Sequence, residues 1–507
     1  MRLARLAALP AHVFLALTAS STLLAVPSAE AQQPDAAGPP AFLTFPRLGL
    51  LDGSRYPGRG HLVWTGDGFA PAPFVHAVAP GAAVALAPRA TTGAGSAASI
   101  NVSNDSGSYE GETGAASNGV TIVGGSNSIF PGACGSNPCY VKAYTSSDGN
   151  TWTATQMSGT WAGKTFGISF DPALDHDLDG NYYFVFGGAP LRGSYPNSIA
   201  VAKADASGLV WSAPVAVTFN RNRYFDDKYY IAVDRSPSQF QNRIYVAWDR
   251  NTSTDQILYV ASSSDAGATW SAPVKVDDGT SRFERVIGAY PAVDQSTGTV
   301  YASWHNYAQD VIYVDKSTSG GASWGTDVAA ATTHTGFGVD IGCNGGREQS
   351  PAHHLKVGPS GTLHLVYADA IQGRGFDILY TRSTDGGAHW SAPVRLNDDA
   401  GGAHQYHPTL SVTGGTGGDA VSVTFYDRRD DAANCLTHVY ATASSDGGLT
   451  WSANTRLTTA ASNFDGNANG PGDYSSSTSF QSLTWPFHSQ HPDGGDAGAF
   501  EIYAFPF

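Results

Sequence analysis

Several residues that could carry acid–base chemistry stand where short apolar stretches of this chain begin. The four are Glu112, Asp227, Asp473 and Tyr474. Cleavage of a glycosidic bond needs one carboxyl group that donates a proton and a second group that attacks the sugar or activates water. We therefore take these four residues as candidate catalytic residues of a glycoside hydrolase.

A second set of residues could hold an anionic substrate. Arginine guanidinium groups bind carboxylates through two parallel hydrogen bonds, and lysine, tyrosine and histidine add charge and further donors. The candidate substrate-binding residues are Arg347, Arg428, Arg429, Lys228, Tyr290 and His407. Each could instead be structural, because charged residues where strands begin also tie neighbouring sheets together.

Two strings rich in Asp and Asn could bind calcium. Oxygen ligands alternate in 175–180 and again in 465–470, where the candidate ligands are Asp465, Asn467 and Asn469. Both strings match the opening of a calcium loop but lack its terminal Glu. The first string is also typical of a hairpin turn. No cofactor is required by the sequence, and calcium is the one metal for which it offers ligands.

The four cysteines are an even number. Cys134 and Cys139 enclose a short turn, and Cys343 and Cys435 remain as a long-range pair. The spacing matches no common zinc pattern, so we predict two disulfides rather than a metal site.

One turn sequence recurs through most of the chain, with Ser-x-Asp-x-Gly-x-Thr-Trp as its fullest form. Six copies, some degenerate, end at Trp152, Trp211, Trp270, Trp324, Trp390 and Trp451, which are 54 to 66 residues apart. The Asp carboxylate can accept backbone N–H groups, Gly allows positive φ, and Trp packs between strands. We call these segments the repeated turns and expect their role to be structural.

Strand-like stretches between the repeated turns complete a larger repeat. Seven strand starts alternate with six repeated turns, and the seventh start follows the last turn. About four strands fit each unit of about 60 residues, as in a propeller blade. The stretch 100–105 resembles the fourth-strand stretch 394–399. We therefore predict an all-β propeller over residues 98–507, built of four-stranded antiparallel blades. Seven blades are favoured over six, and an N-terminal strand closes the last.

The repeated turns resemble the Asp-box (BNR) repeats of the sialidase superfamily. Segments 111–113, 227–234, 426–431 and 472–474 look like those of a secreted bacterial sialidase-like group. The resemblance implies an exo-α-sialidase-like hydrolase with a Tyr nucleophile assisted by Glu, an Asp acid/base and arginines on the substrate carboxylate. The chain has no Phe/Tyr-Arg-Ile-Pro motif. A non-catalytic propeller that binds carbohydrate or protein therefore stays open, and a polysaccharide lyase is the third reading.

The N-terminal segments and the net charge of the chain indicate where the protein is located and which partners it can bind. A basic start, an apolar stretch and Ala29-Glu30-Ala31 predict a signal peptide over 1–31, so we expect a secreted protein, periplasmic or extracellular. Residues 32–97 are rich in Ala, Pro and Gly and are expected to contain a linker. Without 1–31 the chain has 26 basic and 42 acidic residues, a net charge of −16. This charge excludes general nucleic-acid binding, and no later stretch could span a membrane.

The chain order also predicts which end of the propeller carries the site. A repeated turn joins the third and fourth strands of a blade, whereas the loops that lead into first strands lie at the other end. The candidate residues cluster near those loops, so we expect a glycan-binding axial pocket opposite the repeated turns.

Overall fold

The computed structural model describes the part of the chain that holds most of the predicted blades. The described residues are 84–89, 99–105, 109–129, 138–190, 196–221, 224–252, 255–279, 285–334, 339–343, 349, 352–371, 374–465, 470–491 and 500–507, with the backbone of 62–64 and 69–71. All belong to the compact unit Pro39–Phe507. The predicted signal peptide lies outside them.

The described residues form strands and no helix. The first three four-stranded groups, each in chain order, are β4 (Tyr109–Ser117), β5 (Ile122–Ile129), β6 (Lys142–Ser146) and β7 (Thr153–Gln156); β10 (Ile168–His176), β11 (Tyr182–Ala189), β12 (Ser198–Ala204) and β13 (Val215–Ala216); and β14 (Phe225–Val233), β15 (Ile244–Asn251), β16 (Gln256–Ser263) and β17 (Val274–Lys275). The next three are β18 (Val286–Val293), β19 (Val300–Asn306), β20 (Val311–Ser317) and β21 (Val328–Thr332); β22 (His353–Val357), β23 (Leu363–Ile371), β24 (Gly375–Ser383) and β25 (Val394–Arg395); and β26 (Gln405–Gly415), β27 (Gly418–Asp427), β28 (His438–Ser444) and β29 (Thr455–Arg456). Within each group, neighbouring strands are antiparallel.

The last sheet joins the two ends of the described chain. It contains β30 (Ser476–Phe480), β31 (Leu483–Gln490) and β32 (Glu501–Ala504), and its fourth strand is β3 (Ile100–Asn101). Ile100 is paired with Ala504 and Asn101 with Tyr503. This pairing confirms the prediction that an N-terminal strand completes the final sheet. Two small hairpins belong to none of these sheets: β1 (Leu62–Trp64) pairs with β2 (Phe69–Pro71), and β8 (Thr160–Trp161) pairs with β9 (Lys164–Thr165).

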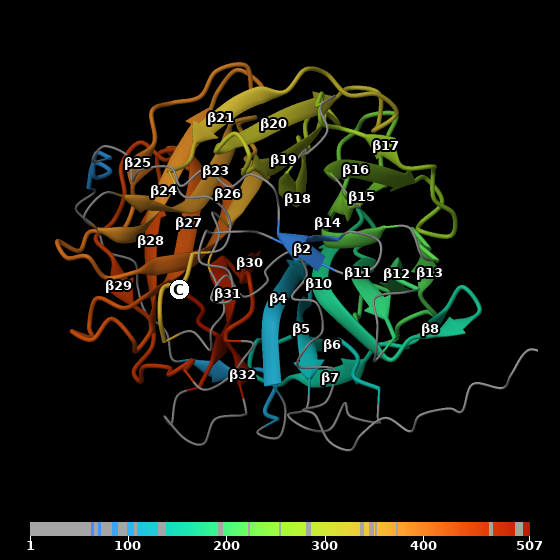
Figure 1. Ribbon diagram of the computed structural model, residues 1–507, viewed down its shortest axis with the longest axis horizontal. Coiled ribbons are helices and arrows are strands. Elements are labelled where there is room, and N and C mark those ends of the chain that lie inside the picture. The colour runs from blue at the N-terminus through green and yellow to red at the C-terminus, as the bar shows by residue number, and fades with distance from the viewer. Residues whose placement is uncertain are drawn as a thin grey trace, which may run out of the picture. The chain divides into compact units, whose positions relative to one another are not determined.

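The first strands of these sheets surround a common axis. β4 contacts β10, and the contacts continue through β14, β18, β22 and β26 to β30, which returns to β4. One of these contacts includes a parallel pairing of Tyr229 with Ala289, which links two sheets. Figure 1 shows first strands such as β4, β10 and β14 facing the centre and the later strands of each sheet farther out. This is the arrangement of a β-propeller.

The repeated turns have the hydrogen bonds expected from their sequence. In the copy that ends at Trp270, Asp265 Oδ1 accepts the N–H of Thr269 at 2.9 Å, and Ser263 Oγ accepts the N–H of Gly267 at 2.9 Å. Gly267 has a φ of 82°, which a residue with a side chain rarely adopts. These hydrogen bonds lower the pKa of Asp265 to about 2. The Asp of this turn therefore holds the turn together.

Residues 84–89 lie inside the predicted linker region but pair with the propeller. Ala87 N–H donates to Arg395 O at 2.8 Å, and Arg395 N–H donates to Ala85 O at 2.8 Å, so the segment runs along β25. Arg89 donates to Ser452 O at 2.6 Å and to Leu396 O at 2.7 Å. We call residues 84–89 the strap.

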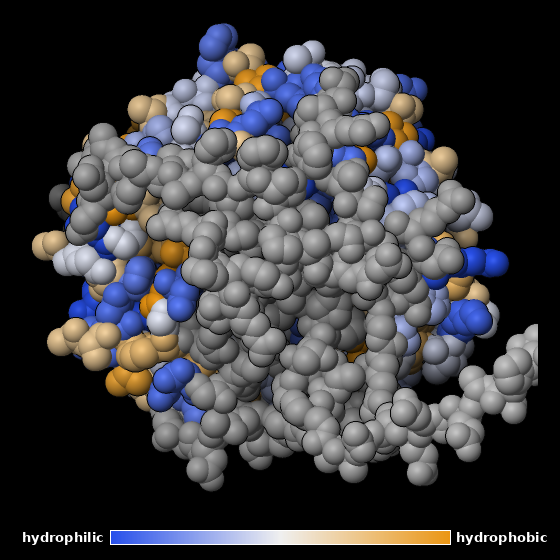
Figure 2. All heavy atoms as spheres, viewed as in Figure 1, coloured by the Kyte–Doolittle hydropathy of each residue, from blue (hydrophilic) through white to orange (hydrophobic). Residues whose placement is uncertain are grey.

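Apolar side chains between the sheets form the core, and a disulfide joins two loops. Cys343 and Cys435 are bonded as predicted. Cys139 is also in a disulfide, but its predicted partner Cys134 lies outside the described residues. No helix of the described part is long and apolar enough to cross a membrane. In Figure 2 the coloured rim shows hydrophilic and hydrophobic residues side by side.

Candidate functional site

Backbone irregularities recur at the same level of the first strands. In five of them, one residue at or beside a break in the pairing has positive φ: Glu112 (54°), Asp171 (54°), Lys228 (44°), Gly288 (75°) and His407 (48°). A β-bulge redirects a side chain, and a non-glycine residue in this conformation costs about 1–3 kcal/mol. Charged residues are thus held near the axis at an energetic cost.

Lys228 is the centre of a buried ionic cluster. Its Nζ lies 2.8 Å from Asp473 Oδ2, 3.3 Å from Asp171 Oδ2 and 3.9 Å from Glu112 Oε1. Burial lowers the pKa of Lys228, but the surrounding carboxylates raise it well above its usual value. Lys228 is therefore a charged ammonium, and three sheets contribute its carboxylate partners. We call Lys228, Asp473, Asp171 and Glu112 the axial cluster.

Asn127 orders this cluster from β5. Its Nδ2 donates to Glu112 Oε2, and its Oδ1 accepts the N–H of Asp171 at 2.8 Å. Glu112 Oε1 accepts the N–H of Asp473 at 3.1 Å. The carboxylate of Glu112 is thereby held between two neighbouring sheets. Neither Asn127 nor Asp171 was predicted from the sequence. Asp171 occupies the same position in β10 as Glu112 in β4, and an alignment of the strands by this position would have found it.

Aromatic rings lie beside the cluster. The Tyr474 ring lies 5.8 Å from Lys228 Nζ and 5.4 Å from the Tyr230 ring. The Tyr230 ring lies 4.6 Å from the Tyr290 ring, which lies 4.9 Å from the ring of His354. Burial raises the pKa of Tyr474 well above its usual value and lowers that of His354. Tyr474 is thus a neutral phenol, and its Oη has no hydrogen-bond partner among the described residues.

Two further carboxyl groups lie close to Lys228 with raised pKa values. Burial raises the pKa of Asp227 well above its usual value, against the opposing charge of Lys228. Burial likewise raises the pKa of Asp249 to about 8. Both side chains are fully buried. These groups can keep a proton at neutral pH, which a general acid must do.

An axial cavity of about 480 Å³ adjoins the aromatic rings. Its wall includes small residues and hydroxyl groups, such as Gly114, Ala173, Ser411 and Ser475, on one side. On the other side it includes Tyr230, Tyr290, His354, Lys356 and the ion pair of Arg235 with Asp175, whose atoms are 2.8 Å apart.

The cavity corrects the predicted position of the pocket. It is lined by the later halves of the first strands, on the side of the repeated turns, whereas the sequence predicted the opposite side. In each sheet, the turn after the first strand and the repeated turn lie at the same end. For example, the N–H of Gly447, in a repeated turn, donates to the carbonyl oxygen of Asp419, just after the turn that follows β26, at 2.9 Å. The charged side chains at the bulges fill the axis in the earlier halves of the strands. The small residues beyond them leave the space open.

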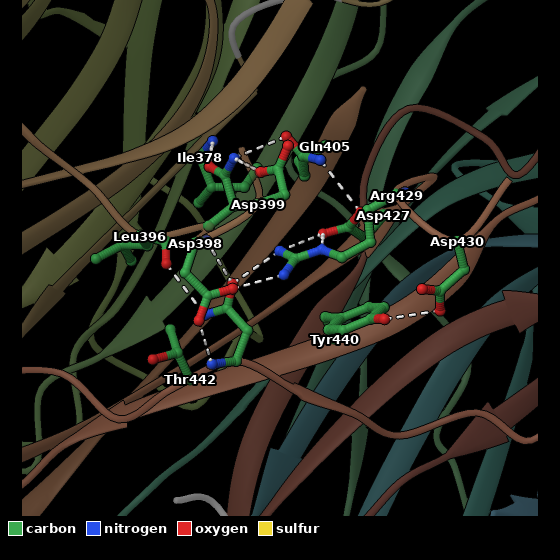
Figure 3. A network of polar contacts seen from close by, with 12 residues as sticks. Ile378, Leu396, Asp398, Asp399, Gln405, Asp427, Arg429, Asp430, Tyr440 and Thr442 are labelled. Atoms are coloured by element: carbon green, nitrogen blue, oxygen red, sulfur yellow. Dashed lines mark hydrogen bonds and ion pairs between the residues drawn. The ribbon is translucent and has the colours of Figure 1, made fainter. Parts of the chain in front are cut away.

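The predicted arginines lie elsewhere in the described structure. Arg428 is fully buried, and its guanidinium donates to the carbonyl oxygens of Ile341, Gly342 and Asn434 at 2.9–3.0 Å, beside the disulfide. Figure 3 shows Arg429 directed at Asp427 and Asp398, with which it forms ion pairs of 2.7 and 2.5 Å. The structure does not bring these two arginines together with Lys228.

The remaining predicted residues have mixed positions. Tyr290 lines the cavity, and His407 is buried with its ring 5.1 Å from that of Tyr406. Arg347, Asn467 and Asn469 lie outside the described residues. Of the predicted calcium ligands, only Asp465 is among the described residues. Within the described part, no group of three or more His, Cys, Asp or Glu side chains could hold a metal ion.

The comparisons with known proteins gave structural matches alone. No family model and no curated protein matches the chain. It is similar to a protein of unknown function from Dyadobacter fermentans, at 15% identity over 81% of this chain and 98% of that one, with a TM-score of 0.46. It is also similar to an intramolecular trans-sialidase from Ruminococcus gnavus, at 14% identity over 82% and 98%, with a TM-score of 0.41. An α-L-arabinanase from Penicillium chrysogenum matches at 11% over 66% and 94%, with a TM-score of 0.43. The function must be argued from the residues of this chain.

Proposed function

We propose that this protein is a secreted glycoside hydrolase that binds a glycan in the axial cavity and cleaves it beside the axial cluster. One observation carries the proposal. Bulges in separate strands bring Glu112, Asp171 and Lys228 together with Asp473 in a buried cluster, next to a cavity with an aromatic wall. Buried carboxyl groups beside a pocket, some with raised pKa values, are typical of acid–base sites.

The residues have separate roles in this proposal. Tyr290 and Tyr230 offer rings on which the apolar face of a sugar can pack, and the opposite hydroxyl groups can bind its polar edge. Lys356 lies 5.6 Å from the centre of the Tyr290 ring and has no ion pair within the described structure. Because Arg235 is paired with Asp175, Lys356 gives the wall its uncompensated positive charge. This charge favours an anionic glycan.

The chemistry needs a proton donor and a nucleophile or base. Asp227 and Asp249 are proposed to supply the acid, because their raised pKa values favour a proton on one of these two groups at neutral pH. Asp473 and Glu112 are proposed to place negative charge beside the positive charge that develops on the sugar. Tyr474 is proposed as the nucleophile, since a neutral phenol is not repelled by an anionic substrate. Its phenol proton passes to Glu112 as the oxygen attacks the sugar, and returns when water releases the sugar from Tyr474.

A non-catalytic glycan-binding propeller is the second candidate. It is favoured by one observation: the axial cluster is ion-paired, and none of its four residues lines the cavity. A cavity wall without the carboxylates binds a sugar but does not cleave it.

We also propose that the propeller has seven blades and spans residues 98–507, after an exported N-terminal region. The support for the number is the closed cycle of first strands, each followed by the three further strands of its sheet. The disulfide of Cys343 with Cys435 suits an oxidising compartment.

Turnover of defined glycans tests the proposed function. The purified protein is incubated with sialosides, uronic-acid oligosaccharides and neutral glycosides, and the products are identified by mass spectrometry and ultraviolet absorbance. Release of a saturated sugar is expected. Tyr474→Phe should lower kcat/KM by about 100-fold or more. Tyr313→Phe is the control, because Tyr313 lies on β20, the third strand of its sheet, and its hydroxyl group is bonded to Gln309. Saturable binding without release would establish the second candidate, and an unsaturated product would establish a lyase.

A further inference from the structure

Two carboxyl groups face each other directly across the first two strands of one sheet. Asp227 of β14 is the register partner of Asp249 of β15. Directly opposed residues on one face have Cβ atoms about 4.5–5.5 Å apart, and like charges in such positions destabilise a sheet. Both side chains have zero exposure, so water does not screen them.

The neighbouring register pair combines two opposite charges. Asp226 is paired with Arg250, and the two groups form two hydrogen bonds of 2.7 and 2.9 Å. The sheet thus places an ion pair on one face and two carboxyl groups on the other. The two carboxyl groups are a separate feature, because the same strands accommodate an Asp–Arg pair one residue earlier.

Each carboxyl group has one oxygen that is bonded and one that is not. Asp227 Oδ1 accepts the N–H of Lys228 at 2.9 Å, and Asp249 Oδ2 accepts Asn251 Nδ2 at 3.0 Å. The backbone N–H of Gly288 also acts on the Asp249 carboxyl group. Asp227 Oδ2 and Asp249 Oδ1 have no hydrogen-bond partner in the described structure. A buried carboxylate oxygen without a donor is costly, whereas a proton held between two carboxyl groups supplies a donor.

The surrounding charges do not neutralise both groups. Lys228 is the cation that acts on both, and it also pairs with the other three carboxylates of the axial cluster. Asp473 adds to the negative field at Asp227, and Asp171 adds to that at Asp249. The charge of Asp249 also acts on Tyr307, which follows β19, and the charge of Arg285, just before β18, acts on Tyr307 in the opposite direction.

We propose that Asp227 and Asp249 share one proton at neutral pH and act as a single acid pair of the axial site. The catalytic part of this inference rests on the proposed function. In that reaction the pair gives its proton to the leaving oxygen as the glycosidic C–O bond breaks. The pair regains a proton from the water that adds to the sugar, so protons balance over one turnover.

Infrared spectroscopy of the protein without substrate tests the shared proton. The wild type at pH 7 is expected to show the carbonyl stretch of a protonated carboxyl group. Asp249→Asn should weaken this signal, because it removes one of the two carboxyl groups and the like charge that adds to burial in raising the pKa of Asp227. Asp227→Asn should do the same, so that either variant suffices if the other fails to fold. Asp226→Asn is the control and should retain the signal.

The result separates this inference from the proposed function. A signal that is absent from the wild type, or that is as strong in a folded Asp249→Asn or Asp227→Asn protein as in the wild type, would overturn the shared proton whatever the activity. A shared proton in a protein that cleaves no glycan would support the pair and reject the proposed hydrolase.

Discussion

At the scale of single residues, strained backbone marks the functional candidates. Glu112, Asp171, Lys228 and His407 have φ values of 44–54°, a conformation that glycine adopts without steric strain. Such strain persists where the surrounding structure enforces it, and it gathers at active sites. Three of these residues meet in the axial cluster. The cluster is therefore held in a costly geometry that packing alone would not select.

Loss of the central cation should destabilise the fold in a pH-dependent manner. Lys228→Met leaves three buried carboxylates without their ammonium partner and should lower the free energy of unfolding by about 3–5 kcal/mol at pH 8. The loss should be smaller at pH 5, because the freed carboxyl groups then take up protons more readily. Urea denaturation at both pH values measures this. Lys164→Met in the exposed hairpin is the control and should change little. An equal loss at both pH values would contradict the account.

The pair of Asp227 and Asp249 should also affect the stability of the wild type. The pKa values of both groups are raised in the folded state, so the native protein binds more protons than the unfolded chain between pH 4 and 8. Their contribution is fully present below about pH 4 and is lost as the pH rises toward 8. Asp249→Asn should flatten this part of the stability curve. A slope unchanged from the wild type would contradict the raised pKa values.

The sequence predicted part of the site at this scale. Glu112, Lys228, Asp473 and Tyr474 were expected near the axis, and they do lie together. Arg428, which directly follows the second strand β27, was also expected at this end of the sheets, yet its guanidinium donates to backbone carbonyl groups. The sequence predicts how far along a strand a residue lies. The bulge that turns the residue toward the axis, or the loop that captures it, depends on tertiary contacts.

At the scale of elements, the strap shows how a segment without a strong pattern becomes ordered. Its six residues, Val-Ala-Leu-Ala-Pro-Arg, have no clear strand pattern. The segment is ordered by the free edge of β25, by the carbonyl group of Leu396 just after β25, and by that of Ser452 beside the repeated turn of the next sheet. Ala87 is 2% exposed. An open sheet edge accepts a passing chain in this way.

The strap should contribute to stability through Arg89. Arg89→Ala removes two charge-assisted hydrogen bonds and should lower the free energy of unfolding by about 1.5–3 kcal/mol. Arg456→Ala is the control, because its ion pair with Asp430 is at the surface and should contribute little. Thermal unfolding measures both. Equal effects of the two changes would show that the strap does not hold the sheets.

At the scale of the whole molecule, the repeats in the sequence were sufficient to predict most of the fold. The spacing of the repeated turns predicted the four-stranded sheets, and the likeness of 100–105 to 394–399 predicted the closing strand β3. The side of the cavity was predicted wrongly, because it depends on which side chains fill the axis. Strand order follows from sequence patterns, whereas the empty space follows from packing.

Closure of the ring should depend on the segment around β3. Val102 is 3% exposed and packs with Ile122, Tyr144 and Phe487. Val102→Asp buries a charge there and should lower the free energy of unfolding by more than about 3 kcal/mol. Val120→Asp is the control, because Val120 is 73% exposed and should tolerate the change. Denaturation measures both, and a stable Val102→Asp protein would show that closure does not need this segment.

The structure of the protein with a bound glycan tests the central claim most directly. A crystal of Tyr474→Phe soaked with a glycan that the wild type cleaves should hold the intact glycan in the axial cavity. Its scissile bond should lie at the end of the cavity nearest Lys228, between Tyr290 and Ser475. A glycan bound at another surface, with the axial cavity vacant, would contradict the account.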